Sequence, residues 1–280
     1  MRLRLFNLVS RDEISVRNVP DADWKAVSAG TDTFTLLSRN GLAAAFRLRE
    51  DGEGCEPIPL PQSWQHLKSP AVSCLHPAHI AACDIFGKVH FCTPEKADTA
   101  RFPKGVQKVS SGCVLAVLTP EGRVWYRSYQ SRYGGDAWTD TGWEAVRDIC
   151  AGPERLCAVT ADGQVLLQTF TSGMTGFFEP SPRAMGQASA IASGWSGIFT
   201  LRDSRLCLNG RILGAGSDFA EVRCGVSRTL EFAVCRRKNG NFLTALTGGT
   251  FIPSSLVIPG VDFISAWDVG DRFLACLSER

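Results

Sequence analysis

Short apolar runs alternate with polar turns along the whole chain. Residues 157–168, CAVTADGQVLLQ, show the pattern clearly: one apolar run ends at Thr160, the chain turns at Asp162-Gly163, and a second run begins at Val165. Asp-Gly between two such runs is a strong β-hairpin signal. Similar runs occur at 34–38, 115–119 and 198–202, and no long stretch has the apolar spacing of a helix. The pattern predicts an all-β protein built from repeated hairpins.

A step of small residues precedes each hairpin. It consists of a β-branched residue, two small residues and usually glycine, as in Val27-Ser28-Ala29-Gly30. Such residues suit a backbone that packs closely against its neighbours. The step recurs at intervals of 31 to 45 residues, and its fourth residues are Gly30, Leu75, Gly112, Gly152, Gly194, Gly225 and Trp267. Repeats of about 40 residues made of strands and turns are typical of β-propeller blades. We therefore predict a seven-bladed β-propeller, with six blades as the alternative.

The two ends of the chain complete one blade between them in this interpretation. The last repeat stops at residues 272–280, RFLACLSER, where its hairpin should turn, while residues 1–9, MRLRLFNLV, alternate as a strand does. Pairing these two segments removes the free strand edges where the ring begins and ends. We expect a single domain over residues 1–280, in which 1–9 complete the C-terminal blade and 10–280 form the successive blades.

Composition limits the class of protein. Hydrophobic residues make up 44% and charged residues 21% of the chain, the net charge is +2, and no apolar stretch approaches the ~18–20 residues that span a bilayer. Nothing in this balance calls for nucleic acid or anionic lipid. The eleven cysteines include no CxxC motif, and free thiols are typical of a reducing compartment. We expect an intracellular, cytoplasmic protein, with cytoskeletal association or a nuclear location left open.

One repeat carries a family resemblance. Ile149-Cys150-Ala151-Gly152, followed by AVTADGQV at 158–165, resembles the repeat of the regulator of chromosome condensation family. The resemblance implies a seven-bladed propeller with a blade shared between the termini. That family includes a nucleotide-exchange factor for the small GTPase Ran, and many relatives are interaction platforms. The Trp-Gly step and the Gly-Gln-Leu-Gly stretch usual in the family are absent here.

A second resemblance covers an aromatic segment. Residues 121–146, EGRVWYRSYQSRYGGDAWTDTGWEAV, are similar to a tectonin-type propeller repeat, and tectonin relatives include lectins and phosphoinositide binders. Aromatic and arginine side chains on loops also anchor protein interfaces. We take Tyr129, Arg132, Tyr133 and Trp138 as candidate partner-binding residues, whereas Trp125 and Trp143 are expected to pack between blades.

The sixth repeat contains a basic segment. Gly225 and Gly240 are 15 residues apart where the corresponding glycines are 10 to 12 apart, and Arg236, Arg237 and Lys238 precede Asn239-Gly240. A protruding hairpin with these three residues would suit an acidic protein surface, phosphates or RNA. A solvated hairpin without a ligand is the alternative.

The sequence motifs do not favour an enzyme. The sequence has no Gly-x-Ser-x-Gly elbow and no phosphate-binding Gly-x-x-x-x-Gly-Lys loop. Cysteines and histidines gather at 74–92, but without a standard zinc spacing. We predict no catalytic residues, no metal and no cofactor. The predicted function is a non-enzymatic interaction platform with a protein partner or larger assembly. A tectonin-like sugar or lipid head-group binder is the alternative, and an exchange factor for a small GTPase is the third hypothesis.

Overall fold

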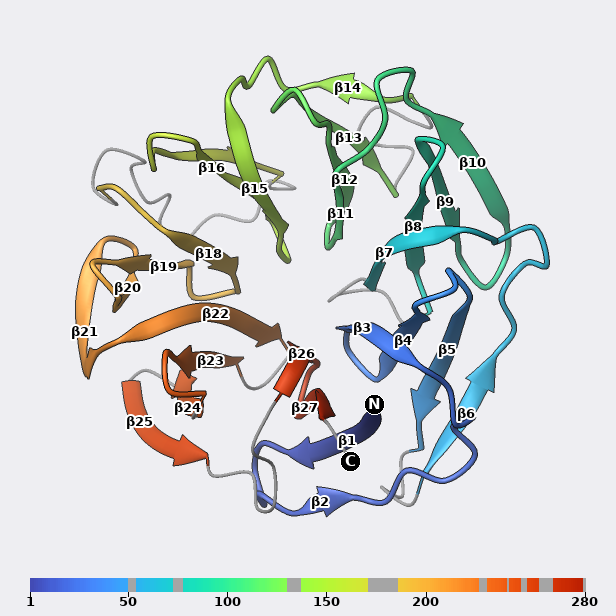
Figure 1. Ribbon diagram of the computed structural model, residues 1–280. Coiled ribbons are helices and arrows are strands. Elements are labelled where there is room, and N and C mark those ends of the chain that lie inside the picture. The colour runs from blue at the N-terminus through green and yellow to red at the C-terminus, as the bar shows by residue number, and fades with distance from the viewer. Residues whose placement is uncertain are drawn as a thin grey trace.

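The computed structural model is a ring of β-sheets around a central axis (Figure 1). It describes residues 1–49, 54–72, 78–129, 137–170, 186–226, 231–240, 242–247, 251–256 and 264–278. These residues form seven antiparallel sheets and no helix, so none of them forms a helix able to cross a membrane. The predicted all-β propeller is confirmed.

Each sheet is a blade whose strands follow one another from the centre outward. Blade one contains β3 (Trp24–Ala29), β4 (Thr33–Ser38), β5 (Ala43–Leu48) and β6 (Cys55–Ile58). Blade two contains β7 (Leu67–Val72), β8 (Ile80–Asp84), β9 (Lys88–Cys92) and β10 (Ala97–Arg101). Blade three contains β11 (Lys108–Ser111), β12 (Val114–Leu118), β13 (Val124–Ser128) and β14 (Thr139–Asp140). The described strands of blade four are β15 (Val146–Ala151), β16 (Arg155–Thr160) and β17 (Val165–Thr169).

The remaining blades complete the ring. Blade five contains β18 (Ala190–Ser193), β19 (Ile198–Arg202), β20 (Arg205–Leu208) and β21 (Arg211–Ser217). Blade six contains β22 (Phe219–Val226), β23 (Glu231–Arg237), β24 (Phe242–Thr247) and β25 (Phe251–Leu256). Blade seven contains β26 (Ile264–Val269), β27 (Phe273–Ser278), β1 (Arg2–Asn7) and β2 (Glu13–Ile14).

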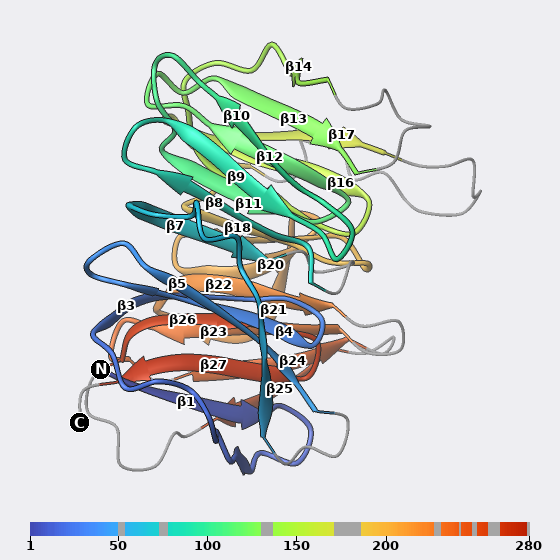
Figure 2. The ribbon, with the colours of Figure 1, turned by 90° about the vertical axis from the view of Figure 1, so that its right-hand side faces the viewer.

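The two ends of the chain meet in blade seven, as the sequence predicts. Strand β1 pairs with β27 along its whole length, from Arg2 opposite Ser278 to Asn7 opposite Phe273. The two strands lie side by side in Figure 2. Leu3 and Leu5 enter the core while Arg2 stays exposed, which is the alternation read from the sequence. The ring is thereby closed by main-chain hydrogen bonds between strands about 270 residues apart in sequence.

Glycine at the end of the small-residue step allows neighbouring blades to touch. A Cβ atom on Gly112 would lie 2.4 Å from the carbonyl oxygen of Ala151 in blade four, and one on Gly225 would lie 2.0 Å from that of Gly270 in blade seven. Both distances are too short for any side chain. The close approach inferred from the sequence is confirmed at these positions.

Two of the predicted steps are out of register. In blade seven the glycine equivalent to Gly30 is Gly270, because both donate their N–H across the same tight turn: Gly30 to the carbonyl oxygen of Thr33, and Gly270 to that of Phe273. The step assigned to residues 264–267 is therefore wrong by three positions. In blade two, Val72 ends its strand as Ala29 does in blade one, so Val72 takes the third position of the step and not the first. The step assigned to 72–75 is therefore displaced by two residues. Residues 73–75 lie outside the described part.

The core lies between adjacent blades. Leu37 and Ala45 of blade one, for example, pack with Ile80 and Cys92 of blade two. The ten cysteines among the described residues are free thiols. Burial raises the pKa of Cys83 and Cys92 to about 11, so these thiols stay protonated and behave as small apolar side chains, as predicted.

Candidate functional site

One face of the ring carries the turns between the second and third strands of the blades. We call it the hairpin face and define it by the turns 39–42, 85–87, 120–123 and 161–164. In each turn a glycine carbonyl accepts a hydrogen bond from the segment that leads to the next blade: Leu67 N–H to Gly41, Phe102 N–H to Gly87 and Val146 N–H to Gly122. These hydrogen bonds hold the turns against the neighbouring segments. They also explain why a glycine recurs at this position of the repeat.

Exposed apolar side chains gather on this face at blades one and two. Leu42 is 54% exposed, Ile85 61% and Phe86 62%. The corresponding turns of blades three and four carry polar residues at the tip, such as Glu121 and Asp162. Three of the five exposed large apolar side chains in the described chain therefore belong to two adjacent turns, a concentration typical of a binding surface.

His66 joins these two turns. Its main chain packs against Gly41, its carbonyl accepts the N–H of Ile85 at 3.1 Å, and its ring lies edge-on to Phe86 with centroids 5.8 Å apart. His66 has a φ of 54°, an uncommon left-handed conformation for a non-glycine residue. We call Leu42, His66, Ile85 and Phe86 the apolar ridge.

A buried pair beneath the ridge fixes its tip. Asp84 Oδ1 accepts the N–H groups of Phe86 (2.8 Å) and Lys88 (2.9 Å), and Oδ2 contacts His90 Nε2 at 3.0 Å. Burial opposes ionisation of Asp84, but these hydrogen bonds outweigh it and lower the pKa of the carboxyl group. In the equivalent turns of blades one and four, the hydroxyl groups of Ser38 and Thr160 accept the corresponding main-chain N–H. In blade two the carboxylate of Asp84 accepts this hydrogen bond instead.

A pair of cations lies beside the ridge. Lys88 on β9 stands directly opposite Arg101 on β10, and both side chains are exposed. Successive side chains alternate along a strand, so Lys88 lies on the same side of β9 as His90, whose ring is 5.9 Å from that of Trp64. His66, in the segment that leads from blade one, lies on this same side of blade two.

An aromatic pocket of about 460 Å³ lies on the other side of blade two, against blade three. Trp138, a residue predicted from the sequence, lines it with Trp125 and Phe102, and its ring lies edge-on to Phe102 at 5.0 Å. Two ion pairs stand at its rim, Lys104 with Glu121 and Arg123 with Asp140. The indole Nε1 of Trp138 is buried without a hydrogen-bond partner.

The other residues of the aromatic segment have different surroundings. The Tyr129 hydroxyl forms a 2.6 Å hydrogen bond with Ser111 Oγ, and its ring lies 4.9 Å from that of His79. Arg132 and Tyr133 lie outside the described residues. Tyr129 and Trp138 pack partly buried against the same core cluster. Trp125 and Trp143 pack against core clusters, as predicted.

The basic segment of blade six is not a longer hairpin. Gly240 follows Phe232, which pairs with Gly225, by eight positions. Gly41 likewise follows Thr33, which accepts the N–H of Gly30, by eight positions. The prediction of a protruding tip is wrong because the extra residues fall between β22 and β23.

The three basic residues of blade six differ in their surroundings. Arg236 pairs with Glu221 and donates to the carbonyl oxygen of Ile264 in blade seven, and Arg237 pairs with Asp218 at 2.6 Å. These two arginines are bound within the fold, whereas Lys238 is exposed. The partner-binding role predicted for the three residues remains a prediction.

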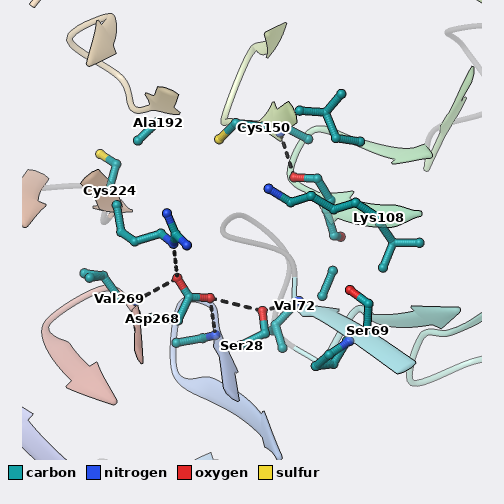
Figure 3. A pocket seen from close by; sticks show the side chains of 18 of the residues that line it. Ser28, Ser69, Val72, Lys108, Cys150, Ala192, Cys224, Asp268 and Val269 are labelled. Atoms are coloured by element: carbon teal, nitrogen blue, oxygen red, sulfur yellow. Dashed lines mark hydrogen bonds and ion pairs between the residues drawn. The ribbon is translucent and has the colours of Figure 1, made fainter. Parts of the chain in front are cut away.

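The centre of the ring holds a channel cavity of about 280 Å³ (Figure 3). Its cations are already neutralised: Lys108 pairs with Asp148 at 2.5 Å, and Arg223 lies within 4 Å of Glu221 and Asp268. Burial raises the pKa of Asp268, against the opposing effect of Arg223 and the neighbouring N–H and O–H donors. Because its charges are satisfied internally, the channel is a weaker candidate site than the hairpin face.

The metal-capable residues noted at 74–92 are dispersed where the structure describes them. His90 bonds Asp84 and His79 packs on Tyr129. No group of three potential metal ligands occurs among the described residues.

Comparison with known proteins shows which folds this chain resembles. No family model matches the sequence, and no curated protein matches it. Among solved structures, human WBSCR16 aligns over 100% of both chains at 12% identity with a TM-score of 0.69. Prp20p from Saccharomyces cerevisiae aligns over 99% of this chain and 92% of its own at 12% identity, with a TM-score of 0.67. RRP9 WD40 repeats give 11% identity and a TM-score of 0.56 over 99% of this chain and 98% of theirs.

The class that these findings define is the β-propeller. Within that class, the fold is similar to those of the RCC1-like propellers WBSCR16 and Prp20, as the repeat at 149–165 predicts. Identities of 12% to these structures establish the fold alone.

Proposed function

We propose that this chain is a non-enzymatic propeller that binds a protein partner through the hairpin face of blades one and two, as a subunit of a larger assembly. The observation that carries the proposal is the apolar ridge, where Leu42, Ile85 and Phe86 are exposed on turns held by His66 and Asp84. Apolar side chains presented on rigid supports bury area at little entropic cost, which favours protein association.

Structural neighbours give general support. Prp20p is described with binding properties toward Gsp1p and histones, and yeast RCC1 (Prp20) has been crystallised with Kap60 bound. Propellers with this fold therefore serve as protein-binding modules, and the ridge supplies a surface on this chain suited to the same general task.

Co-purification from the native cell extract tests the proposal. The intact protein is compared with an Ile85→Ser/Phe86→Ser variant and with Ile212→Ser, which removes an exposed apolar side chain from β21 in blade five. A third variant, with Tyr129, Tyr133 and Trp138 changed to serine, tests the aromatic segment. Thermal unfolding first confirms that each variant folds.

We expect that the intact chain and the Ile212→Ser variant each retain one protein at fixed stoichiometry. The Ile85→Ser/Phe86→Ser variant should lose this protein. Equal retention by that variant would overturn the ridge as the contact. Loss in the aromatic variant alone would move the contact to Trp138 and its neighbours.

We also propose an intracellular, reducing location. Cys150 and Cys157 stand directly opposite each other on β15 and β16 and are free thiols. Thiol labelling of the native protein, denatured with and without reductant, tests this. Equal labelling is expected, and a gain of thiols on reduction would contradict it.

A further inference from the structure

We propose that the partner segment bound by the apolar ridge is an acidic amphipathic peptide. Its apolar side chains cover Leu42, Ile85 and Phe86, and its carboxylates pair with Lys88 and Arg101. The inference rests on the proposed function and assigns the chemistry of the partner.

Lys88 and Arg101 form a cross-strand pair of like charge. They are directly opposite in the register of β9 and β10, where side chains lie within a few ångströms of each other, and like charges in such pairs are unfavourable. Neither has an ion-pair partner among the described residues. The fold therefore tolerates a local repulsion that an anion would relieve.

The outer strand pairs of blades one, three and seven carry opposite charges. In blade one Arg47 is directly opposite Glu56. In blade three Arg123 reaches Asp140 at 2.6 Å, and in blade seven Arg4 reaches Glu13 at 2.7 Å. Compared with these three, the pair in blade two is the exception, and it stands beside the apolar ridge.

The carboxylates near the ridge are already engaged. Asp84 is held by His90 and by two main-chain N–H groups, Asp23 pairs with Arg39, and Glu121 pairs with Lys104. The cations of Lys88 and Arg101 therefore remain as local positive charge. Charge of one sign beside an exposed apolar patch selects a partner of the opposite sign and steers its approach.

The geometry sets the spacing within the partner. Lys88 follows Phe86 by two residues, and its N–H bonds the same Asp84 oxygen that holds Phe86. Two residues span at most roughly 7 Å, and less where the chain turns, as it does here at Gly87. A peptide with an acidic residue two or three positions from a large apolar residue can engage the ridge and the cation pair together.

Selection of phage-displayed random dodecapeptides on the immobilised full chain tests this. Enriched peptides are synthesised, and their binding is measured by fluorescence anisotropy at low and high salt. Three variants are compared: Lys88→Glu/Arg101→Glu, Ile85→Ser/Phe86→Ser, and the control Arg205→Glu/Arg211→Glu. The control makes the same change of charge at exposed positions of blade five.

The expected peptides combine apolar residues with aspartate or glutamate. Their binding weakens at high salt, falls about tenfold or more in the Lys88→Glu/Arg101→Glu and Ile85→Ser/Phe86→Ser variants, and is unchanged in the control. Peptides that depend on Ile85 and Phe86 but bind Lys88→Glu/Arg101→Glu as well as the intact chain would overturn the acidic partner and leave the proposed function standing. Absence of any enriched peptide that depends on Ile85 and Phe86 would contradict both.

Discussion

Asp268 of blade seven accepts a hydrogen bond from the hydroxyl of Ser28 in blade one, at 3.1 Å, although 240 residues separate the two in sequence. The same oxygen accepts the N–H of Ala29 at 2.9 Å, and Arg223 of blade six lies 3.9 Å from the other oxygen. One carboxylate therefore joins three blades at the channel (Figure 3). The pairing of β1 with β27, within blade seven, joins the two ends of the chain farther from the axis.

Replacing Asp268 with alanine should weaken ring closure. The variant leaves the N–H of Ala29 without its acceptor and Arg223 without a neighbouring carboxylate. We expect the free energy of unfolding to fall by about 1–3 kcal/mol. Urea unfolding measures it, with Asp12→Ala at an exposed site as the control. Equal losses in both variants would show that the contact contributes nothing particular.

Asp268 should also shape the dependence of stability on pH. Its pKa is raised in the folded state because burial disfavours the charged form. A raised carboxyl pKa contributes stability below the ordinary value of 3.8, and this contribution is lost as the pH rises through the folded value. Asp268→Asn cannot titrate, so the stability of the natural chain relative to this variant should fall as the pH rises above about 4. Urea unfolding over a pH series measures the difference, and a constant or rising difference would refute the assignment.

Lys88→Glu should separate stability from binding. Glutamate opposite Arg101 turns a repulsive cross-strand pair into an attractive one, so we expect the free energy of unfolding to rise by about 0.2–1 kcal/mol. The same change removes a cation from the proposed contact, so partner retention should fall. Thermal unfolding and co-purification measure the two effects. A loss of stability would show that Lys88 has a favourable structural role instead.

The basic residues of blade six should differ in their effect on folding. Arg236→Ala and Arg237→Ala break ion pairs with Glu221 and Asp218, and each should lower the free energy of unfolding by about 1 kcal/mol. Lys238→Ala, at an exposed position, should change it by less than about 0.5 kcal/mol. Urea unfolding of the three variants decides this, and equal effects would mean that the observed pairs do not stabilise the blade.

Local pattern made the fold predictable. Alternation specifies which residues of 1–9 face the core, and Asp162-Gly163 marks a hairpin whose turn and strands the structure contains. The seventh step is misplaced because Trp267 stands where blade one has a β-branched residue, and Asp268 and Val269 stand where it has small residues. The step could be aligned only through the hydrogen bond that Gly270 makes, which depends on tertiary structure.

The candidate site was harder to predict. Ile85 and Phe86 continue the apolar run of β8 and look like buried strand residues until the turn at Asp84 is known. The signal available in the sequence was an apolar pair at a turn where other repeats have polar residues. The roles of Arg236 and Arg237 depend on Glu221 and Asp218, which lie across the sheet and not beside them in sequence.

The most direct test of the central claim is site-specific crosslinking in the native extract. Leu42 is replaced with p-benzoylphenylalanine on the hairpin face, and in a second protein Ile212 on β21 is replaced in the same way. Both positions are exposed. We predict a single discrete protein adduct from position 42, absent from position 212 and lost when Lys88→Glu/Arg101→Glu is added. No adduct at position 42, or the same adduct at both positions, would contradict it.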